Sequence, residues 1–214
     1  MAWHLGLGLR KENIRFRQHE PTERAHYAAD SWDIEYNFPE WGFKELEGIA
    51  NRTDYDLKTH SKSSGRDLSY TDPETQENYI PYVIEPSVGV SRLFLALLVD
   101  AYTEDGKRVV LKLNPTLAPV KVAVFPLVAN KEEIVNKARD VYRMLKKHVV
   151  TAWDDRGNIG KRYLAQDEIG TPWCVTIDYD TLDNDTVTIR DRDTTKQERV
   201  NISKLVDYIQ GRLS

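Results

Sequence analysis

Three polar residues that could hold a small charged ligand lie close together in the sequence: Glu85, Ser87 and Arg92. A strand-like pattern precedes them and an unbroken apolar run follows, so they occupy a junction between a strand and a helix. Arg92 falls in the first helical turn, where the helix dipole opposes a cation. A guanidinium can pair with phosphate or lie flat on an aromatic base, which favours such a ligand. The alternative is a plain salt bridge from Arg92 to Glu85 or to a neighbour.

A second pair of acidic groups, Glu45 and Glu47, lies on a strand predicted over 42–52. The period of two places both carboxylates on one face of the strand and Leu46 on the other. Two like charges are costly if buried together without a cation. A solvated strand face is the plain interpretation, and a bound amine, Mg²⁺ or ribose is the sharper one.

The elements that must position these groups follow from the hydrophobic pattern of the first half. Alternating apolar residues predict strands, and Gly65 marks the end of a helix that begins near Asp54. The expected elements are strands over 14–19, 26–38 and 42–52, a helix over 54–63, a hairpin over 67–78, and a strand, turn and helix over 79–102. They indicate an α+β domain with an antiparallel sheet.

The second half has a different pattern, in which strands alternate with helices after a linker over 114–119. Such alternation predicts an α/β domain with a mixed sheet covered by helices. The expected strands are 120–128, 149–153, 173–179, 186–190 and 198–202; the expected helices are 131–148, one within 156–170, and one capped by Ser203. The acidic segment 180–185 is interpreted as a solvated hairpin turn.

The net charge of −4 counts against a general polyanion binder held by bulk electrostatics. From Pro115 onward the chain has 16 Lys and Arg against 15 Asp and Glu, whereas the residues before it have 14 against 19. The second half is therefore the better candidate to contact nucleic acid, through local patches.

The remaining composition excludes several classes of protein. Cys174 lies in an apolar run and is expected to be a small buried residue. The five histidines show no metal-ligand spacing, so we expect no protein-built zinc or other metal site. No apolar run approaches about 18 residues and no secretory signal begins the sequence, so we expect a cytoplasmic protein without membrane contact.

Several separate motifs in one order cover nearly the whole chain. The first two are Glu45-Leu46-Glu47-Gly48-Ile49-Ala50-Asn51-Arg52-Thr53-Asp54-Tyr55-Asp56-Leu57 and Glu85-Pro86-Ser87-x-Gly89-x-x-Arg92. The later ones are 117–124, 157–163, 166–170 and 188–193. Together they resemble the back half of the dimeric, single-chain-type glycyl-tRNA synthetases of class II. The segment ending at Arg92 is similar to motif 3 of that family, and the later stretches are similar to its anticodon-binding domain.

The resemblance implies a ligase that activates glycine with ATP and Mg²⁺ as substrate and transfers it to its tRNA. It implies the C-terminal part of a catalytic domain, including motif 3, over 1–113, an anticodon-binding domain over 114–214, and a homodimer for the full-length parent. By matching residues, Glu85 and Ser87 would bind glycine, with Glu85 taking the ammonium group. Glu45, Leu46, Gly89 and Arg92 would bind ATP, and Arg92 and Glu45 would serve catalysis.

In the second domain, Lys161, Arg162, Arg190 and Arg192 are the candidates for contact with the tRNA anticodon stem and loop. Single-stranded bases are read by stacking and by arginine contacts. The alternative is that the run from Arg190 to Asp193 pairs with itself across strands.

The sequence also departs from the family. It has no Phe-Arg-x-Glu of the kind expected in motif 2, the nearest approach being Phe16-Arg17-Gln18-His19. We therefore expect a C-terminal portion of a longer enzyme, inactive by itself. A different class of function is a non-catalytic tRNA-binding or accessory protein on the same scaffold, like the accessory subunit of a mitochondrial DNA polymerase.

Overall fold

The computed structural model of the chain describes residues 1–106 and 108–213 and divides into two compact units. Unit 1 is Met1–Ala96, and unit 2 begins at Leu97, inside helix α3 (Val90–Ala101). The predicted first domain extends further, to residue 113. Ser214, the last residue of the predicted second domain, lies outside the described residues.

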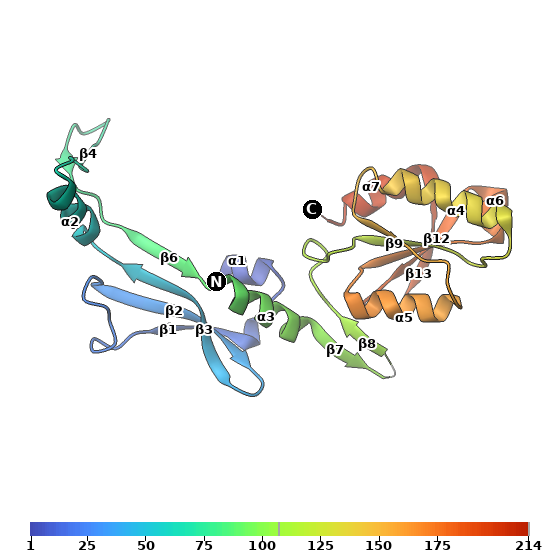
Figure 1. The fold of residues 1–214 in the computed structure, drawn as a ribbon, viewed down its shortest axis with the longest axis horizontal. Helices are drawn as coiled ribbons and strands as arrows, with labels where there is room; N and C mark the ends of the chain where they lie inside the picture. The colour runs from blue at the N-terminus through green and yellow to red at the C-terminus, as the bar shows by residue number, and fades with distance from the viewer. Residues whose placement is uncertain (107, 214) are drawn as a thin grey trace. The chain divides into compact units, whose positions relative to one another are not determined.

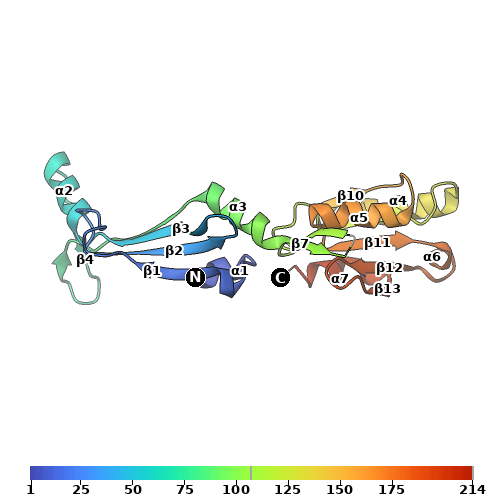
Figure 2. The same ribbon diagram turned by 90° about the horizontal axis from the view of Figure 1, so that it is seen from below.

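Unit 1 is built on an antiparallel sheet with the strand order β1, β2, β3, β6. The bounds are β1 (Ile14–Gln18), β2 (Asp30–Phe38), β3 (Gly42–Asn51) and β6 (Ile84–Val88). Figure 2 shows β1, β2 and β3 side by side. The sheet contributes a core of buried side chains, namely Ile14, Ile34, Tyr36, Phe38 and Leu46. The predicted antiparallel sheet is confirmed, although β2 begins at Asp30, later than the pattern indicated.

Smaller elements complete unit 1. They are α1 (Ala2–Gly6), η1 (Lys11–Asn13), α2 (Tyr55–Ser64), β4 (Tyr70–Thr71) and β5 (Asn78–Tyr79). Gly65 ends α2 in the left-handed conformation, as predicted, with φ of 69°. In Figure 1, α2 and β4 lie at the opposite end of unit 1 from α1. The strand predicted from Tyr79 onward is wrong over its first part, because Pro81 has no N–H for a ladder and regular pairing of β6 begins only at Ile84.

A hairpin that the sequence pattern did not predict follows α3. Its strands are β7 (Tyr102–Asp105) and β8 (Arg108–Leu111), paired antiparallel, and Gly106 in the turn has a φ of +64°. The pattern indicated only a break over 103–106. Because the hairpin lies after Leu97, it belongs to unit 2.

The loop predicted as a linker is tied together by one ammonium group. Lys121 Nζ donates to the carbonyls of Pro115, Thr116 and Ala118 at 3.0, 2.7 and 2.7 Å. Burial lowers the pKa of Lys121. The segment is therefore an ordered loop rather than an extended tether.

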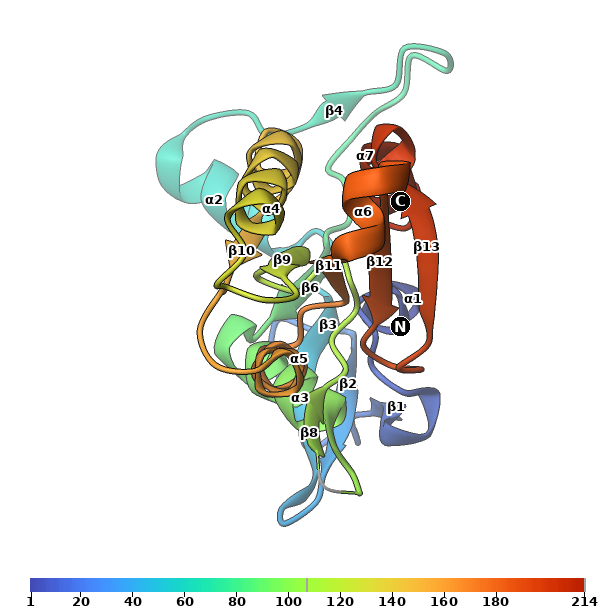
Figure 3. The same cartoon turned by 90° about the vertical axis from the view of Figure 1, so that its right-hand side faces the viewer.

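Unit 2 is a mixed sheet in the order β10, β9, β11, β12, β13, which Figure 3 shows from left to right. Its strands are β9 (Val122–Pro126), β10 (Thr151–Trp153), β11 (Trp173–Ile177), β12 (Thr186–Asp191) and β13 (Gln197–Asn201). Strand β9 pairs parallel with β10 and β11, and β12 pairs antiparallel with β11 and β13. The predicted mixed α/β sheet is confirmed.

Helices cover both faces of this sheet (Figure 1). On one face α4 (Glu132–Leu145) and α7 (Leu205–Gln210) pack on the main core, and on the other α5 (Ile159–Ile169) covers a smaller cluster. Cys174 belongs to that smaller cluster and is buried, as predicted. None of the helices among the described residues is long and apolar enough to cross a membrane.

Two local predictions in unit 2 are wrong. The acidic segment expected as a hairpin turn is a short helix, α6 (Tyr179–Asn184), because Asp178 and Thr181 form a reciprocal capping box before it. The last helical segment is capped by Asn201, whose side chain accepts from the N–H of Ser203, so Ser203 is not itself the cap. It begins as a short 3-10 turn, η2 (Ile202–Lys204).

Candidate active site

The sheet of unit 1 has one strongly polar face. Strand pairing brings Asp33 of β2 opposite Arg17 of β1 and Gly48 of β3, and Gly48 opposite Ser87 of β6. Since residues paired across strands point to the same side, polar groups from all four strands share this face. The further members of the face are Arg15, Glu35, Glu45, Ala50 and Glu85.

An irregularity in β3 separates two carboxylates that the sequence pattern placed together. Glu35 of β2 pairs with Glu45, but its neighbour Ile34 pairs with Glu47, so Leu46 is an extra residue. This bulge reverses the alternation beyond Leu46. Glu45 stays on the polar face, whereas Glu47 is buried with its carboxylate 3.4 Å from His4 Nε2. The predicted shared face of Glu45 and Glu47 is therefore wrong.

Buried carboxylates on the polar face lie beside basic side chains. Asp33 Oδ2 lies 2.7 Å from His19 Nε2 and 3.5 Å from Arg17. Glu35 contacts Arg15 at 2.7 Å and Arg17 at 3.2 Å. Asp33 and Glu35 are 6% and 7% exposed, and the guanidinium groups of Arg15 and Arg17 are the cations that permit their burial.

Three of the predicted site residues line one cavity of about 280 Å³ on this face: Glu45, Glu85 and Ser87. Asp33 and Gly48 line it as well. A Cβ placed on Gly48 would lie 3.5 Å from Glu45 Oε1, so a side chain there would project among the carboxylates. The cavity is small, and four carboxylate residues, Glu23, Asp33, Glu45 and Glu85, are among those that line it, which suits a small cationic ligand.

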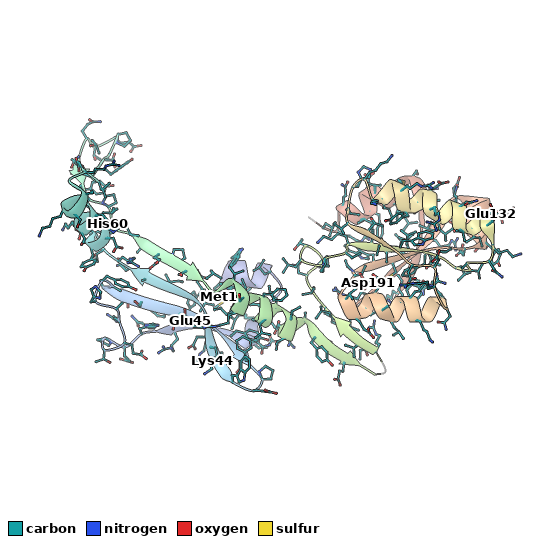
Figure 4. All side chains as sticks on the ribbon, viewed as in Figure 1. Met1, Lys44, Glu45, His60, Glu132 and Asp191 are labelled. Carbon is teal, nitrogen blue, oxygen red and sulfur yellow. The ribbon has the colours of Figure 1, made fainter. Side chains whose placement is uncertain are left out.

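Arg92 does not line this cavity but a neighbouring one of about 340 Å³, with Phe38, Trp41, Lys44 and Glu45. Its Nη1 donates to the carbonyl of Glu45 at 2.5 Å and lies 3.9 Å from Glu45 Oε2. Figure 4 labels Lys44 and Glu45, which are consecutive on β3. Glu45 thus lines both cavities and connects the two groups of predicted residues.

Leu46 and Gly89, the two remaining residues predicted to bind ATP, are joined to each other by a backbone hydrogen bond. The Leu46 side chain is 1% exposed, and its carbonyl accepts from the N–H of Gly89 at 2.9 Å. A Cβ on Gly89 would meet only ordinary contacts with Arg92 and Leu46. In this structure these residues join β3 to the start of α3, and any contact with ATP would run through their backbone.

Sequence reasoning missed Arg52, which contacts a residue that lines the cavity. Arg52 Nη1 donates to Glu85 Oε2 at 2.6 Å, and the same guanidinium lies over the ring of Tyr27, 4.0 Å from its centroid. Asp56 holds the other side of the guanidinium. The spacing of Arg52 and Asp56, four residues apart at the start of a predicted helix, was the available signal.

Three of the four anticodon candidates lie in the interior of unit 2. Arg162, Arg190 and Arg192 are 2%, 6% and 2% exposed, whereas Lys161 is exposed on α5. Arg190 forms a bidentate pair with Asp167 at 2.8 and 2.9 Å. Arg162 donates to the carbonyls of Pro126, Leu127, Asp154 and Gly157. Arg192 donates to the carbonyls of Leu113 and Gly170 and to the carboxylate of Asp193. These three arginines therefore stabilise the domain in this conformation, and Lys161 is the one exposed residue of the four candidates.

A further cavity of about 580 Å³ lies in unit 2, against β12, β13 and α7. Trp173, Tyr208 and Arg212 line it, with the Arg212 guanidinium 3.5 Å from the centroid of the Tyr208 ring. Burial, followed by a hydrogen bond to Glu198, raises the pKa of Tyr208 to about 12. Asp191, labelled in Figure 4, is another of its lining residues.

Among residues 1–106 and 108–213, no group of three or more His, Cys, Asp or Glu side chains could hold a metal ion. The polar face of unit 1 offers hydrogen bonds and charge but no preformed metal cage.

Comparisons with known proteins match the second half of the chain to one family and nearly the whole chain to a group of relatives. Residues 121–212 match the family described as anticodon binding domain. The chain is 55% identical to glycine–tRNA ligase of Clostridium kluyveri, over 98% of this chain and 45% of that protein. The identity is 52% for the enzyme of Streptomyces coelicolor and 54% for that of Caldanaerobacter subterraneus, with 48% and 46% of those proteins covered.

Residues 121–212, within unit 2, thus match an anticodon binding domain. Along its whole length the chain is homologous to the glycine–tRNA ligases of class II. It spans about half the length of the curated relatives that it matches.

Proposed function

We propose that the polar cavity of unit 1 is the glycine site of a glycine–tRNA ligase. The observation that carries the proposal is the meeting of Glu85, Ser87 and Glu45 around one small cavity, in a chain homologous to these ligases. Glu85 accepts hydrogen bonds from the ammonium group, and Ser87 adds a short polar contact. Gly48 opposite Ser87 leaves room for a substrate with no side chain.

ATP with Mg²⁺ is the second substrate, and the neighbouring cavity is its proposed place. Arg92 would stack on adenine or reach a phosphate, beside the aromatic rings of Phe38 and Trp41. Glu45 would act between the two substrates because it lines both cavities. Catalysis would come from alignment of the glycine carboxylate with the α-phosphate and from neutralisation of its charge.

The glycine site is tested by calorimetric titration of the 214-residue chain with glycine. Alanine tests exclusion of a methyl group, and glycolate tests the need for an ammonium group. We expect glycine to bind and Glu85→Gln to weaken it about tenfold or more, since an uncharged amide replaces a charge-assisted partner. Equal binding of glycine and glycolate would refute the assignment of Glu85.

We further propose that the chain alone does not charge tRNA at a useful rate. No Phe-Arg-x-Glu segment is present to supply a cation for the α-phosphate, and loss of one such contact commonly costs about 100-fold or more in rate. The assay is glycine-dependent exchange of pyrophosphate into ATP, before and after addition of the remaining ligase portion as a separate polypeptide. Robust exchange by the 214-residue chain alone would contradict this proposal.

For unit 2 we propose contact with the anticodon region of glycine tRNA, with a homodimeric cytoplasmic ligase as its setting. Lys161 supplies an exposed charge, and the cavity beside Tyr208 and Arg212 offers surfaces on which an unstacked base can lie. Lys161→Gln and Arg212→Gln should each weaken binding, with Lys147→Gln, exposed on the same unit, as matched control. Labelled glycine tRNA and an unrelated tRNA are titrated at two salt concentrations. Equal affinity for both tRNAs would leave only non-specific electrostatics.

A further inference from the structure

Behind Glu85, which lines the proposed glycine cavity, the Arg52 guanidinium is held between two carboxylates. Arg52 follows the end of β3 and donates through Nη1 to Glu85 Oε2 at 2.6 Å. Its Nε and Nη2 donate to the two oxygens of Asp56, in the first turn of α2. Its plane lies over the Tyr27 ring at 4.0 Å. The guanidinium is therefore fixed on two edges and one face.

The anchoring of Arg52 does not depend on Glu85. The pair with Asp56 is bidentate, and the Asp56 carboxylate is well placed at the N-terminal end of a helix. Hydrogen bonds from Arg52 lower the pKa of Asp56, and those to Asp56 and then Glu85 raise the pKa of Arg52. Asp56 and Tyr27 thus hold Arg52 in an orientation in which its Nη1 donor points to Glu85 on β6.

Glu85, in contrast, has little else to hold its side chain. It lies on β6, an edge strand of the sheet, and its side chain is 40% exposed. An exposed glutamate ordinarily samples several rotamers, and ordering it costs conformational entropy when a ligand binds. Among the described residues, the one side chain that donates a hydrogen bond to the Glu85 carboxylate is Arg52, and it donates to Oε2. Oε1 therefore remains for a ligand.

We propose that Arg52 is a positioning residue for glycine recognition, acting through Glu85. It holds Oε2 so that Oε1 is already oriented for the ammonium group, and Asp56 and Tyr27 hold Arg52 in turn. This inference rests on the proposed role of Glu85 in glycine binding. Preorganisation of this kind strengthens binding by removing an ordering cost.

Electrostatics alone and positioning predict opposite effects of removing Arg52 on glycine affinity, which makes the inference testable. Arg52 is a cation beside a site for a cation, so removing its charge should strengthen ammonium binding if charge alone mattered. Positioning predicts that the same change weakens binding. We expect Arg52→Gln to weaken glycine binding about tenfold, measured by calorimetry on the 214-residue chain at neutral pH.

Two controls separate positioning from general damage. Arg66→Gln removes an exposed arginine just beyond α2 and should leave glycine affinity within about twofold of the parent chain. Arg52→Gln combined with Glu85→Gln should bind glycine no more weakly than Glu85→Gln alone, because Arg52 acts only through that carboxylate. Circular dichroism and thermal unfolding verify that each variant is folded.

A second variant covers loss of folding in Arg52→Gln. Asp56→Asn keeps the Arg52 charge but loosens its anchor, and should weaken glycine binding about threefold. Unchanged or tighter binding in a folded Arg52→Gln, or a further loss in the double variant, would overturn the inference. If Glu85→Gln itself leaves glycine binding unchanged, the proposed function fails instead, so the two failures are distinguishable.

Discussion

Substitution of Asp167 by Asn is expected to destabilise unit 2 severely. Asp167 is fully buried, and its two oxygens accept from Arg190 at 2.8 and 2.9 Å and from Arg108 at 3.0 Å. Arg190 and Arg108 have side chains only 7% and 11% exposed. The neutral amide leaves both guanidinium groups without their shared counter-ion, and breaking such a buried pair costs about 3–5 kcal/mol.

The single cysteine provides an assay confined to unit 2. Cys174 is buried in that unit, and burial raises the pKa of its thiol, so it is protected from thiol reagents until the unit opens. A loss of about 3–5 kcal/mol corresponds to labelling about 100- to 1000-fold faster or more, at about 1.4 kcal/mol per tenfold. Labelling is followed by mass spectrometry under native conditions.

Asp140→Asn is the matched control on the same unit. Asp140 pairs with Arg143 at 3.1 Å, but both side chains are about 70% exposed, so its loss should cost less than about 1 kcal/mol. Labelling of Cys174 in Asp167→Asn within about twofold of that in Asp140→Asn would refute the reasoning. It would mean that the two arginines find other partners or water at little cost.

Three further results are expected. Gly170→Ala should raise the Cys174 labelling rate at least tenfold, because Gly170 has φ of +81° and a Cβ there would lie 2.8 Å from a carbonyl oxygen of β8. Gly160→Ala is the control and should not raise the rate, because Gly160 lies inside a helix and has no such contact. Leu145→Ala, at a fully buried position of α4, should lower the free energy of unfolding by about 2–5 kcal/mol in urea denaturation. Burial opposes ionisation of Asp178, but hydrogen bonds led by Arg199 outweigh it and lower its pKa. Its contribution to stability is therefore present above the ordinary aspartate pKa and lost as pH falls through the lower folded value, so Asp178→Asn should flatten the acid limb of the stability curve.

Much of the framework was predictable because it rests on periodicity. The alternation in β1, β2 and β3 and the continuous apolar strand β9 follow from burial of one or both sheet faces. The strand-to-helix junction before α3 was predictable in the same way. The convergence of Glu85 and Ser87 with Glu45 followed from this topology, but Arg92, which we expected in the same pocket, lines the neighbouring cavity.

What escaped prediction depended on single residues and on contacts distant in sequence. The extra residue Leu46 reversed the face of Glu47, and no period reveals where a strand bulges. Arg190 and Arg192 resemble a basic surface motif until their distant partners are seen, which are Asp167 for Arg190 and the carbonyls of Leu113 and Gly170 for Arg192. Asp178 and Thr181, which form the capping box of α6, have the spacing of a helix start, but the acidic composition of the segment led us to expect a turn.

The hairpin β7–β8 has a consequence for transfer of this domain to another protein. Arg108 of β8 donates to Asp167 and to the carbonyl of Arg192, and Gly170 lies against the backbone of Leu111. The match to anticodon binding domains begins only at residue 121, after this hairpin. The compact unit is therefore longer than the matched segment. A domain cut at residue 121 would lack Arg108, one of the two cations that pair with Asp167, and would expose the surface that the hairpin covers.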